Sequence, residues 1–352
     1  MCFVFSMKIA LDAMGGDHAP ENIIHGAILA LGEYPHISKL FLTGDSPRIE
    51  AELKKHGCND GRIELIHTTQ IVEMSDSGLD AVRRKKDSSI SRAVDLVKDG
   101  KAQAVVSAGH TGAAVTASLI KLRTLPGVER PAIASIMPSL GKHWVLIDAG
   151  ANPDAEPSHL VQNAIMGAAY AECVLGRKNP EIGLMSNGTE PDKGNALTKE
   201  TRALLSAIPA LNFRGNVEGH DIYHNPPDVV VCDGFVGNVL LKTSESLAHA
   251  IFAMMKRELM SEFRTKIGAA LAKPAFKRVH KATNADESGG MPLLGVNGVT
   301  IIAHGGASAY AMKNALRMAC ETIQHSVNPH IIEAVKRHHD TTTKPANTNP
   351  SS

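Results

Sequence analysis

The sequence lacks several features that would place it in a class at once. Aromatic residues make up only 4% of its 352 residues, so platforms that stack nucleobases or sugars are not expected. Charge of one sign is lacking as well, because 37 Lys and Arg balance 36 Asp and Glu and leave a net charge of +1. This balance argues against a chain whose main task is to neutralise nucleic-acid phosphates, and we expect no nucleic-acid partner.

Cysteines are few and scattered. The five are Cys2, Cys58, Cys173, Cys232 and Cys320, and no two form a CxxC pair. Neither a disulfide framework nor a structural zinc site is expected, and a reducing compartment such as the cytoplasm fits best. Apolar runs of the roughly 18–20 residues that span a membrane are absent too. Residues 1–6 lack the pattern of a signal peptide, so we interpret them as a short N-terminal extension.

Short apolar runs alternate with amphipathic stretches along the chain. The apolar runs lie at 7–13, 39–43, 63–67, 103–107, 132–137, 143–148, 181–186, 228–233 and 298–303. Helical periodicity marks 21–34, 46–57, 88–100, 111–123, 158–176 and 307–325. This alternation predicts an α/β protein with three α/β/α layers and a mostly parallel sheet that helices cover on both faces.

The domain organisation is predicted from linkers and changes in composition along the chain. No Pro- or Ser-rich linker divides the chain, so we expect a single domain over residues 7–327. From Asn328 the sequence becomes polar and rich in turn-forming residues, which predicts a frayed C-terminal tail at 328–352.

Polar, glycine-rich segments follow most of the predicted strands. They lie at 12–18, 43–45, 107–112, 148–152, 186–195, 232–238 and 304–308. In a parallel sheet the carboxyl ends of the strands share one edge, so we expect these segments to form one ligand site there. Several lead directly into predicted helices, whose N-terminal N–H groups favour an anion.

Known nucleotide motifs do not explain these loops. Gly15 and Gly16 are followed by Asp17 and Pro20, which is not a GxGxxG fingerprint, and residues 188–195 lack the GK[ST] ending of a Walker A loop. Lys193 in the second loop is either a point charge that holds a phosphate or an ordinary solvated lysine.

Familiar catalytic constellations are missing as well. The sequence contains neither GxSxG nor HExxH, and no metal site is expected. Cys232 is either an acyl-accepting thiol or, more often for such a position, a small buried hydrophobe. His110 and His304 stand at strand-to-helix turns, where each could orient a phosphate or carbonyl oxygen or cap a backbone group.

One segment differs from the rest of the chain. Between Leu247 and Leu271 apolar residues recur at three- and four-residue spacing, and residues 256–281 carry eight Lys and Arg against two Glu. This pattern predicts a protruding, basic amphipathic helical segment over about 244–281 that breaks near Pro274. Such a segment suits an anionic membrane or an acidic protein, or else a subunit interface or a covering of the core.

Several separate motifs, in order, resemble the family of bacterial phosphate acyltransferases of phospholipid synthesis. The motifs are 7–17 (MKIALDAMGGD), 84–89 (RKKDSS), 107–113 (SAGHTGA), 129–132 (ERPA), 148–152 (DAGAN), 233–238 (DGFVGN) and 303–307 (AHGGA). The family usually has Asn where this chain has His110, and the resemblance covers roughly residues 7–327.

This resemblance implies an activity and partners. It implies transfer of an acyl group from acyl-[acyl carrier protein] to inorganic phosphate, with no metal or organic cofactor. The acyl phosphate would feed glycerophospholipid synthesis through a membrane-bound glycerol-3-phosphate acyltransferase. The implied fold is that of the isopropylmalate dehydrogenase and phosphotransacetylase group, in a homodimer attached peripherally to the membrane. The alternatives are a phosphotransacetylase-like enzyme that uses acyl-CoA and a non-catalytic, membrane-bound scaffold for acyl carrier protein.

Site residues are assigned from strand-end position and motif match. We expect Lys193 to contact the phosphate or the oxyanion, Asn238 to donate to the carbonyl oxygen, and Asp233 to orient its neighbours. The expected substrate-binding residues are Asp12, Gly15, Gly16, Asp17, Gly109, His110, Thr111, Gly112, Asn152, His304, Gly305 and Gly306. The acyl chain needs an apolar groove, and the amphipathic segment at 247–271 is the expected wall.

Overall fold

The structure, a computed structural model, describes residues 6–73 and 75–343. Its sheet contains β1 (Met7–Asp12), β2 (Ile37–Gly44), β3 (Ile63–His67), β4 (Ala104–Ser107), β5 (Ala132–Met137), β6 (Trp144–Ile147), β7 (Ile182–Met185), β8 (Phe213–Val217), β9 (Val229–Val231), β10 (Met291–Leu294) and β11 (Val299–Ile302). The helices are α1 (Glu21–Glu33), α2 (Ser46–Lys55), α3 (Gly78–Arg84), α4 (Ser89–Lys98), α5 (Thr111–Leu122), α6 (Pro157–Leu175), α7 (Ala196–Ser206), α8 (Gly234–Leu259), α9 (Phe263–Thr283), α10 (Ala285–Ser288), α11 (Ala309–Gln324) and α12 (Val327–Thr343).

The sheet consists of two parallel halves that run in opposite directions. The strand order is β3-β2-β1-β4-β11-β10-β5-β6-β9-β7-β8. Strands are parallel from β3 to β11 and again from β6 to β8, but β10 is antiparallel to both of its neighbours and β5 is antiparallel to β6. The predicted mostly parallel sheet is confirmed. The expectation that all carboxyl ends share one edge is wrong, because the antiparallel steps turn the second half around.

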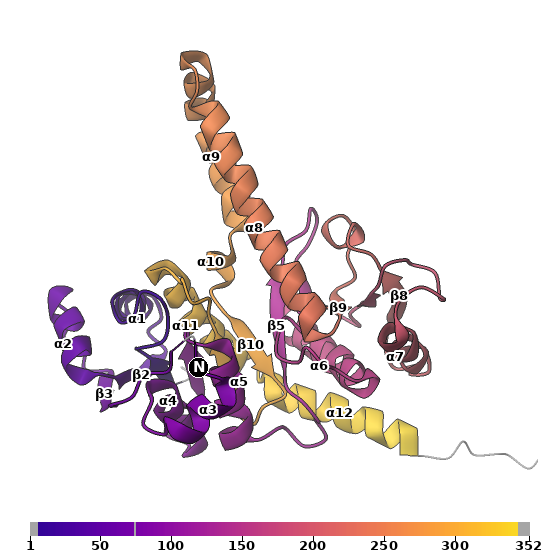
Figure 1. Ribbon diagram of the computed structural model, residues 1–352, viewed down its shortest axis with the longest axis horizontal. Helices are drawn as coiled ribbons and strands as arrows, with labels where there is room; N and C mark the ends of the chain where they lie inside the picture. The colour runs from indigo at the N-terminus through magenta and orange to yellow at the C-terminus, as the bar shows by residue number, and fades with distance from the viewer. Residues whose placement is uncertain (1–5, 74, 344–352) are drawn as a thin grey trace, which may run out of the picture.

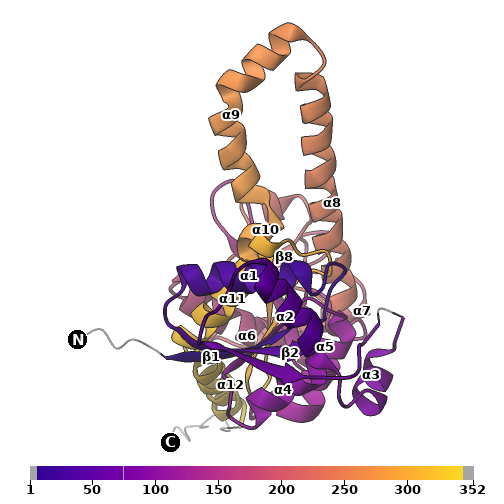
Figure 2. The same ribbon diagram turned by 90° about the vertical axis from the view of Figure 1, so that its left-hand side faces the viewer.

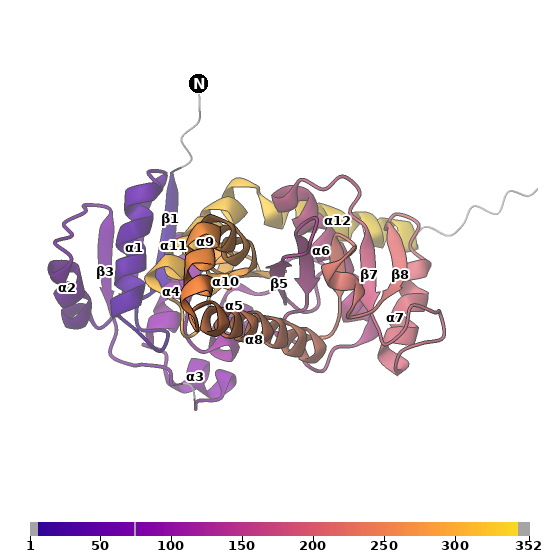
Figure 3. The same cartoon turned by 90° about the horizontal axis from the view of Figure 1, so that it is seen from above.

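Helices cover both faces of the sheet, as the alternation predicted (Figure 3). On one face α1 and α11 pack on the first half through Ile24 and Met312, and α6 packs on the second half through Leu160. On the other face α4, α5 and the first turns of α8 share one apolar cluster with both halves, which includes Val94 and Leu241. The two halves therefore have a continuous core beneath the loops that carry the expected site.

The C-terminal segment is a helix and not the frayed tail that was expected from Asn328. Helix α12 packs along α6, and Ile331 and Val335 on its inner face are 0% and 2% exposed. Asn328 contributes by donating from its side chain to the carbonyl oxygens of Val296 and Gly298. A few apolar residues on one face therefore hold residues 328–343 as a helix against α6, although most of the other residues in this segment are polar. Residues 344–352 of the expected tail and 1–5 of the expected extension lie outside the described residues.

Helices α8 and α9 form a hairpin that projects from the sheet (Figures 1 and 2). The predicted protruding segment is confirmed, but its break is not at Pro274. The chain turns between Leu259 and Phe263, where Glu262 and Thr265 form the capping box that starts α9. Pro274 lies inside α9, and Figure 2 shows that this helix bends along its length.

Candidate functional site

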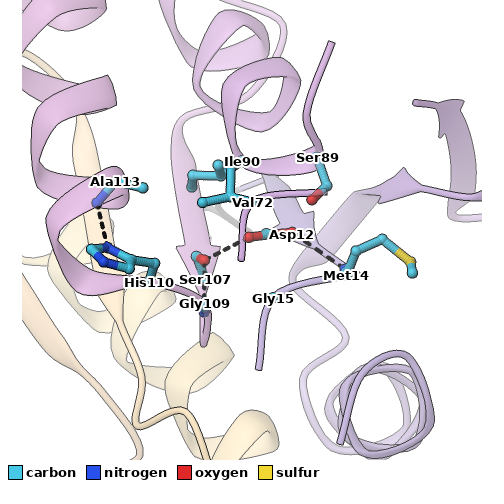
Figure 4. A pocket seen from close by; sticks show the side chains of 10 residues that line it. All are labelled: Asp12, Met14, Gly15, Val72, Ser89, Ile90, Ser107, Gly109, His110 and Ala113. Atoms are coloured by element: carbon cyan, nitrogen blue, oxygen red, sulfur yellow. Dashed lines mark hydrogen bonds between the residues drawn. The ribbon is translucent and has the colours of Figure 1, made fainter. Parts of the chain in front are cut away.

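The first group of expected site residues meets at the carboxyl ends of β1, β4 and β11. Asp12, 2% exposed, accepts a hydrogen bond of 2.7 Å from the Ser107 hydroxyl, whose oxygen accepts 3.1 Å from the Gly109 N–H (Figure 4). These residues, with Ser89 and His110, line a small pocket. Burial raises the pKa of the Asp12 carboxyl, although hydrogen bonds from Ser89, Ser107 and the backbone oppose the shift.

The glycines of this group let two loops touch. A Cβ on Gly15 would lie 2.5 Å from the Asp12 carboxylate and 2.7 Å from the Gly109 nitrogen, which is closer than any side chain tolerates. Gly16 has a φ of 115° and faces the carbonyl oxygen of Gly305, which accepts a hydrogen bond of 2.8 Å from the Asp17 N–H. The loops after β1, β4 and β11 are therefore packed backbone against backbone.

The two histidines of this group cap backbone groups. His110 is the N-cap of α5, and its Nδ1 accepts 3.0 Å from the Ala113 N–H. Asn, the usual residue of the resembled family at this position, is also a strong N-cap, so the substitution preserves this function. His304 Nδ1 accepts 3.0 Å from the Gly306 N–H. Since both Nδ1 atoms are acceptors, the proton of each neutral ring lies on Nε2, which can donate to a ligand. Thr111 and Gly112 form the first turn of α5, next to His110.

A second group lies at the carboxyl ends of β6 and β9. Its centre is Asp148, which is 0% exposed and was not among the expected site residues. Its carboxylate accepts hydrogen bonds from the N–H groups of Ile133, Gly150, Ala151 and Asn152 and from the Asn152 side-chain amide, at 2.7–3.1 Å. Asp148 thereby fixes the loop that carries Asn152, which also donates to the Pro131 carbonyl.

This second loop adjoins the start of α8. Asp233 is the N-cap of α8 and accepts from the N–H groups of Phe235 and Val236 at 3.0 and 2.9 Å. Asn238, one turn later, lies beside Gly150, where a Cβ would be 3.4 Å from that of Asn238. We expected Asp233 only to orient its neighbours. The structure shows that it does so as the N-terminal cap of α8.

Cys232 is not an available nucleophile. It is 3% exposed, and its thiol points to the Asp148 carbonyl oxygen at 3.7 Å. Burial raises the pKa of this thiol well above its ordinary value, and the nearby carboxylates raise it further. The interpretation of Cys232 as a small buried hydrophobe is confirmed.

Lys193 makes no hydrogen bond with either group among the described residues. It lies in the loop between β7 and α7, where its N–H donates to the Glu190 carbonyl oxygen and its stem covers Gly188. Its side chain is exposed and makes no hydrogen bond within the described part of the chain. The structure therefore does not join Lys193 to Asn238 or Asp233, although all three follow strands of the second half.

Helix α8 connects the two groups. It starts beside Asn152, whose carbonyl oxygen accepts 2.8 Å from the Gly234 N–H, and runs toward the loop after β11. Glu245, in its fourth turn, is close enough to His304 for the imidazole to lower the pKa of the carboxyl. Burial has the larger, opposite effect and raises the pKa of Glu245. Glu245 was also not expected, since it falls within none of the strand-end motifs.

One cluster offers ligand atoms for a metal ion among the described residues. Glu218, His220 and Asp221, after β8, bring such atoms within 4.8 Å of one another. The cluster lies on the second half beyond β7 and shares no residue with either group of site residues. Its contacts, such as Asp221 accepting from the Glu218 N–H, are those of a local turn.

The fold and the strand-end loops define an α/β/α protein of the phosphotransacetylase fold class. A phosphotransacetylase from Streptococcus pyogenes superposes with a TM-score of 0.61 at 18% identity and covers 94% of both chains. A branched-chain phosphotransacylase from Enterococcus faecalis gives 0.54 at 17% identity, over 90% of this chain and 99% of that one. At these identities the likeness concerns the fold alone.

Sequence comparison is more specific. A family model described as "Fatty acid synthesis protein" matches residues 7–330. A protein from Geotalea uraniireducens named phosphate acyltransferase is 49% identical over 333 residues, 95% of each chain. One of the same name from Akkermansia muciniphila is 48% identical over 337 residues, 94% of this chain and 96% of its own. The chain belongs to this fatty acid synthesis protein family. Among its described residues, no helix is long and apolar enough to cross a membrane.

Proposed function

We propose that the chain transfers an acyl group from acyl-[acyl carrier protein] to inorganic phosphate and so forms an acyl phosphate for glycerophospholipid synthesis. The observation that carries this proposal is the near-full-length identity of about 49% to a relative named phosphate acyltransferase. The site supports it, because its loops bring together glycines and two imidazoles whose Nδ1 atoms accept from backbone N–H groups, while Cys232 is inaccessible.

The chemistry needs no covalent enzyme intermediate. A phosphate oxygen attacks the thioester carbonyl, the C–O bond forms, and the C–S bond breaks as the proton of the phosphate passes to the leaving thiolate. The protein must hold phosphate and thioester together and stabilise the oxyanion of the tetrahedral intermediate. A single well-placed donor contributes about 3–4 kcal/mol to such a step.

The proposed roles follow the two groups of loops. The loops after β1, β4 and β11 bind the substrates through Gly109, His110 and His304, and Asp12 orients its neighbours in these loops. Asn238 donates to the carbonyl oxygen, in a position fixed by the loop around Asp148 and by the Asp233 cap. Lys193 contacts phosphate from the side of the second half. No metal or organic cofactor takes part in this proposal.

Lys193 is tested by kinetics at low phosphate. Because a solvent-exposed lysine acts as a point charge for an anion, Lys193→Ala should raise the KM for phosphate about tenfold or more and change stability little. The matched control is Lys199→Ala, an exposed lysine on the neighbouring α7. Near-normal turnover of Lys193→Ala at low phosphate contradicts this role.

The donor is tested by comparing palmitoyl-[acyl carrier protein] with palmitoyl-CoA. The proposal expects phosphate-dependent thiol release from the carrier protein and not from CoA. Release from CoA alone would favour the phosphotransacetylase-like alternative. Tight binding of the carrier protein without thiol release would favour the scaffold.

We further propose that the enzyme is a cytoplasmic homodimer that attaches peripherally to the membrane and passes its product to a membrane-bound glycerol-3-phosphate acyltransferase. The hairpin supports this proposal. Within it α9 buries no residue, and large apolar side chains such as Phe263 and Leu271 are 78% and 80% exposed. Large exposed apolar side chains among basic residues are typical of interaction sites.

A further inference from the structure

The segment between β3 and α4 forms one wall of the pocket at the first group of loops. Val72 of this segment and Ser89 at the start of α4 line the pocket together with His110 (Figure 4). Helix α3 lies in the same segment and packs against the first turns of α5, where a Cβ on Gly78 would be 2.6 Å from the Gly112 carbonyl oxygen. A partner that docks on α3 therefore sits next to the expected substrate site.

Internal contacts hold this segment in place. Lys85, directly after α3, donates from its ammonium group to the Ile71 carbonyl oxygen at 2.9 Å and to the Asp76 carboxylate at 2.6 Å. Asp87 accepts from the N–H and the hydroxyl of Thr69 at 3.0 and 2.7 Å. A surface that is ordered before its partner arrives loses little conformational entropy when the partner binds.

The outer face of α3 is basic, and these contacts do not use it. Helix α3 and the two residues after it contain four Lys and Arg against one Asp. Arg83 and Lys86 are exposed and form no ion pair within the described part of the chain. The Arg84 Nε lies 3.5 Å from the Asp80 carboxylate, but the arginine side chain is 81% exposed, and such surface pairs are weak. Leu79, 44% exposed, lies one turn before Arg83 on the same helix face.

We propose that Leu79, Arg83, Arg84 and Lys86 form the docking surface for the acidic carrier protein that delivers the thioester. The inference rests on the proposed function, which needs such a protein beside the pocket. Basic side chains without partners complement an acidic protein surface and steer its approach. The hairpin projects away from the sheet, whereas α3 lies beside it (Figures 1 and 2). A carrier protein on α3 is therefore placed to present its thioester to the pocket.

The balance of charge and apolar surface favours a protein over a membrane at α3. Among the described residues of α3 and the loop before it, the large exposed apolar side chains are Ile71 and Leu79, each 44% exposed. The hairpin exposes much more, since Phe263 and Leu271 are 78% and 80% exposed. A lipid surface therefore suits the hairpin, and an acidic protein suits the mainly charged surface at α3.

The test reverses two charges of the docking surface. Arg83→Glu combined with Lys86→Glu should raise the Kd for unacylated carrier protein, and the KM for its palmitoyl thioester, by about tenfold or more, because attraction becomes repulsion. The kcat and the KM for phosphate should stay within about twofold, because docking does not change the chemical step. Added salt should shrink the difference in Kd, since salt screens exposed charges. The matched control, Lys98→Glu combined with Lys101→Glu, makes the same change in net charge at the end of α4 that lies opposite the pocket and should bind the carrier protein normally.

A charge-preserving variant separates loss of charge from a folding defect. Arg83→Lys combined with Lys86→Arg keeps both charges and should bind the carrier protein as the unmodified protein does. If it loses binding as strongly as the charge-reversed variant, charge is not what this surface supplies, and the proposal is overturned.

Binding and turnover separate this inference from the proposed activity. Carrier-protein binding is titrated without phosphate and so does not depend on the reaction. If charge reversal weakens binding but the unmodified protein shows no phosphate-dependent thiol release, the proposed function fails and the docking surface stands. If thiol release requires phosphate and charge reversal changes neither Kd nor KM, the docking surface is wrong and the proposed function stands. A raised KM for phosphate alone, or lost binding to anionic vesicles alone, overturns the docking surface in favour of a phosphate site or a membrane contact.

Discussion

At the scale of single residues, buried carboxylates organise the loops of the site. Asp12 joins the loops after β1 and β4 through the Ser107 hydroxyl, and Asp148 collects five N–H donors around Asn152. Buried carboxylates are stable only when such donors surround them. Asp12 and Asp148 therefore hold the loops that face the substrates, and neither carboxylate needs to touch a substrate.

Asp12 makes stability depend on pH. Its pKa is raised above 3.8 in the folded protein, so the folded state binds this proton more tightly than the unfolded state does. The carboxyl therefore lowers the free energy of unfolding as pH rises from about 4 through the folded pKa. Asp12→Asn removes this titration, so the unfolding free energy of the variant minus that of the unmodified protein should increase with pH. Urea unfolding at a series of pH values measures it, and a flat or falling difference contradicts the account.

The sequence pointed to many of these residues but not to their partners. Strand-end position and motif match identified Asp12, Gly15, Gly109 and His110, which the structure brings together in one pocket. Asp148 and Ser107 lay within quoted motifs, yet only three-dimensional contacts reveal what a buried polar group bonds to. Glu245 lies in the middle of a helix, where no local signal marks proximity to a loop sixty residues later.

At the scale of elements, the position of Asn238 depends on how the first turn of α8 is capped. Asp233→Ala removes the side-chain cap of this helix and should cost about 1 kcal/mol of stability and part of the activity. Asp233→Asn should keep both, because Asn caps as well as Asp does. Urea unfolding and the thiol-release assay measure the two effects. A stable Asp233→Asn protein that has lost its activity would show that the carboxylate acts in the chemistry itself.

The elements that the sequence predicted are those with strong, regular patterns. Buried strands such as β4 and β9 and the amphipathic helices on the sheet were located to within a few residues. Strands β8 and β10 were missed, since β8 is a polar edge strand and β10 contains Pro292. The reversal of the sheet had a visible signal, because the connection between the runs at 132–137 and 143–148 is too short for a parallel crossover.

At the scale of the whole molecule, the hairpin projects from the sheet (Figure 2). It carries exposed basic and apolar side chains. Reversing Lys256, Arg257 and Arg264 to Glu should weaken binding to anionic vesicles or to the acidic carrier protein, since each basic residue near an anionic surface contributes about 1 kcal/mol. The matched control reverses three exposed lysines off the hairpin, Lys54, Lys98 and Lys101. Vesicle sedimentation and carrier-protein titration measure the effect, and unchanged binding of both partners contradicts a binding role for the hairpin charges.

Two half-sheets of opposite direction, bridged by one long helix, give this molecule two groups of polar loops. The central claim is that these parts serve acyl transfer to phosphate. The most direct test measures free-thiol release from palmitoyl-[acyl carrier protein] with and without inorganic phosphate. The account predicts thiol release that requires phosphate and is accompanied by acyl phosphate. Release at the same rate without phosphate, or none with it, would contradict the account.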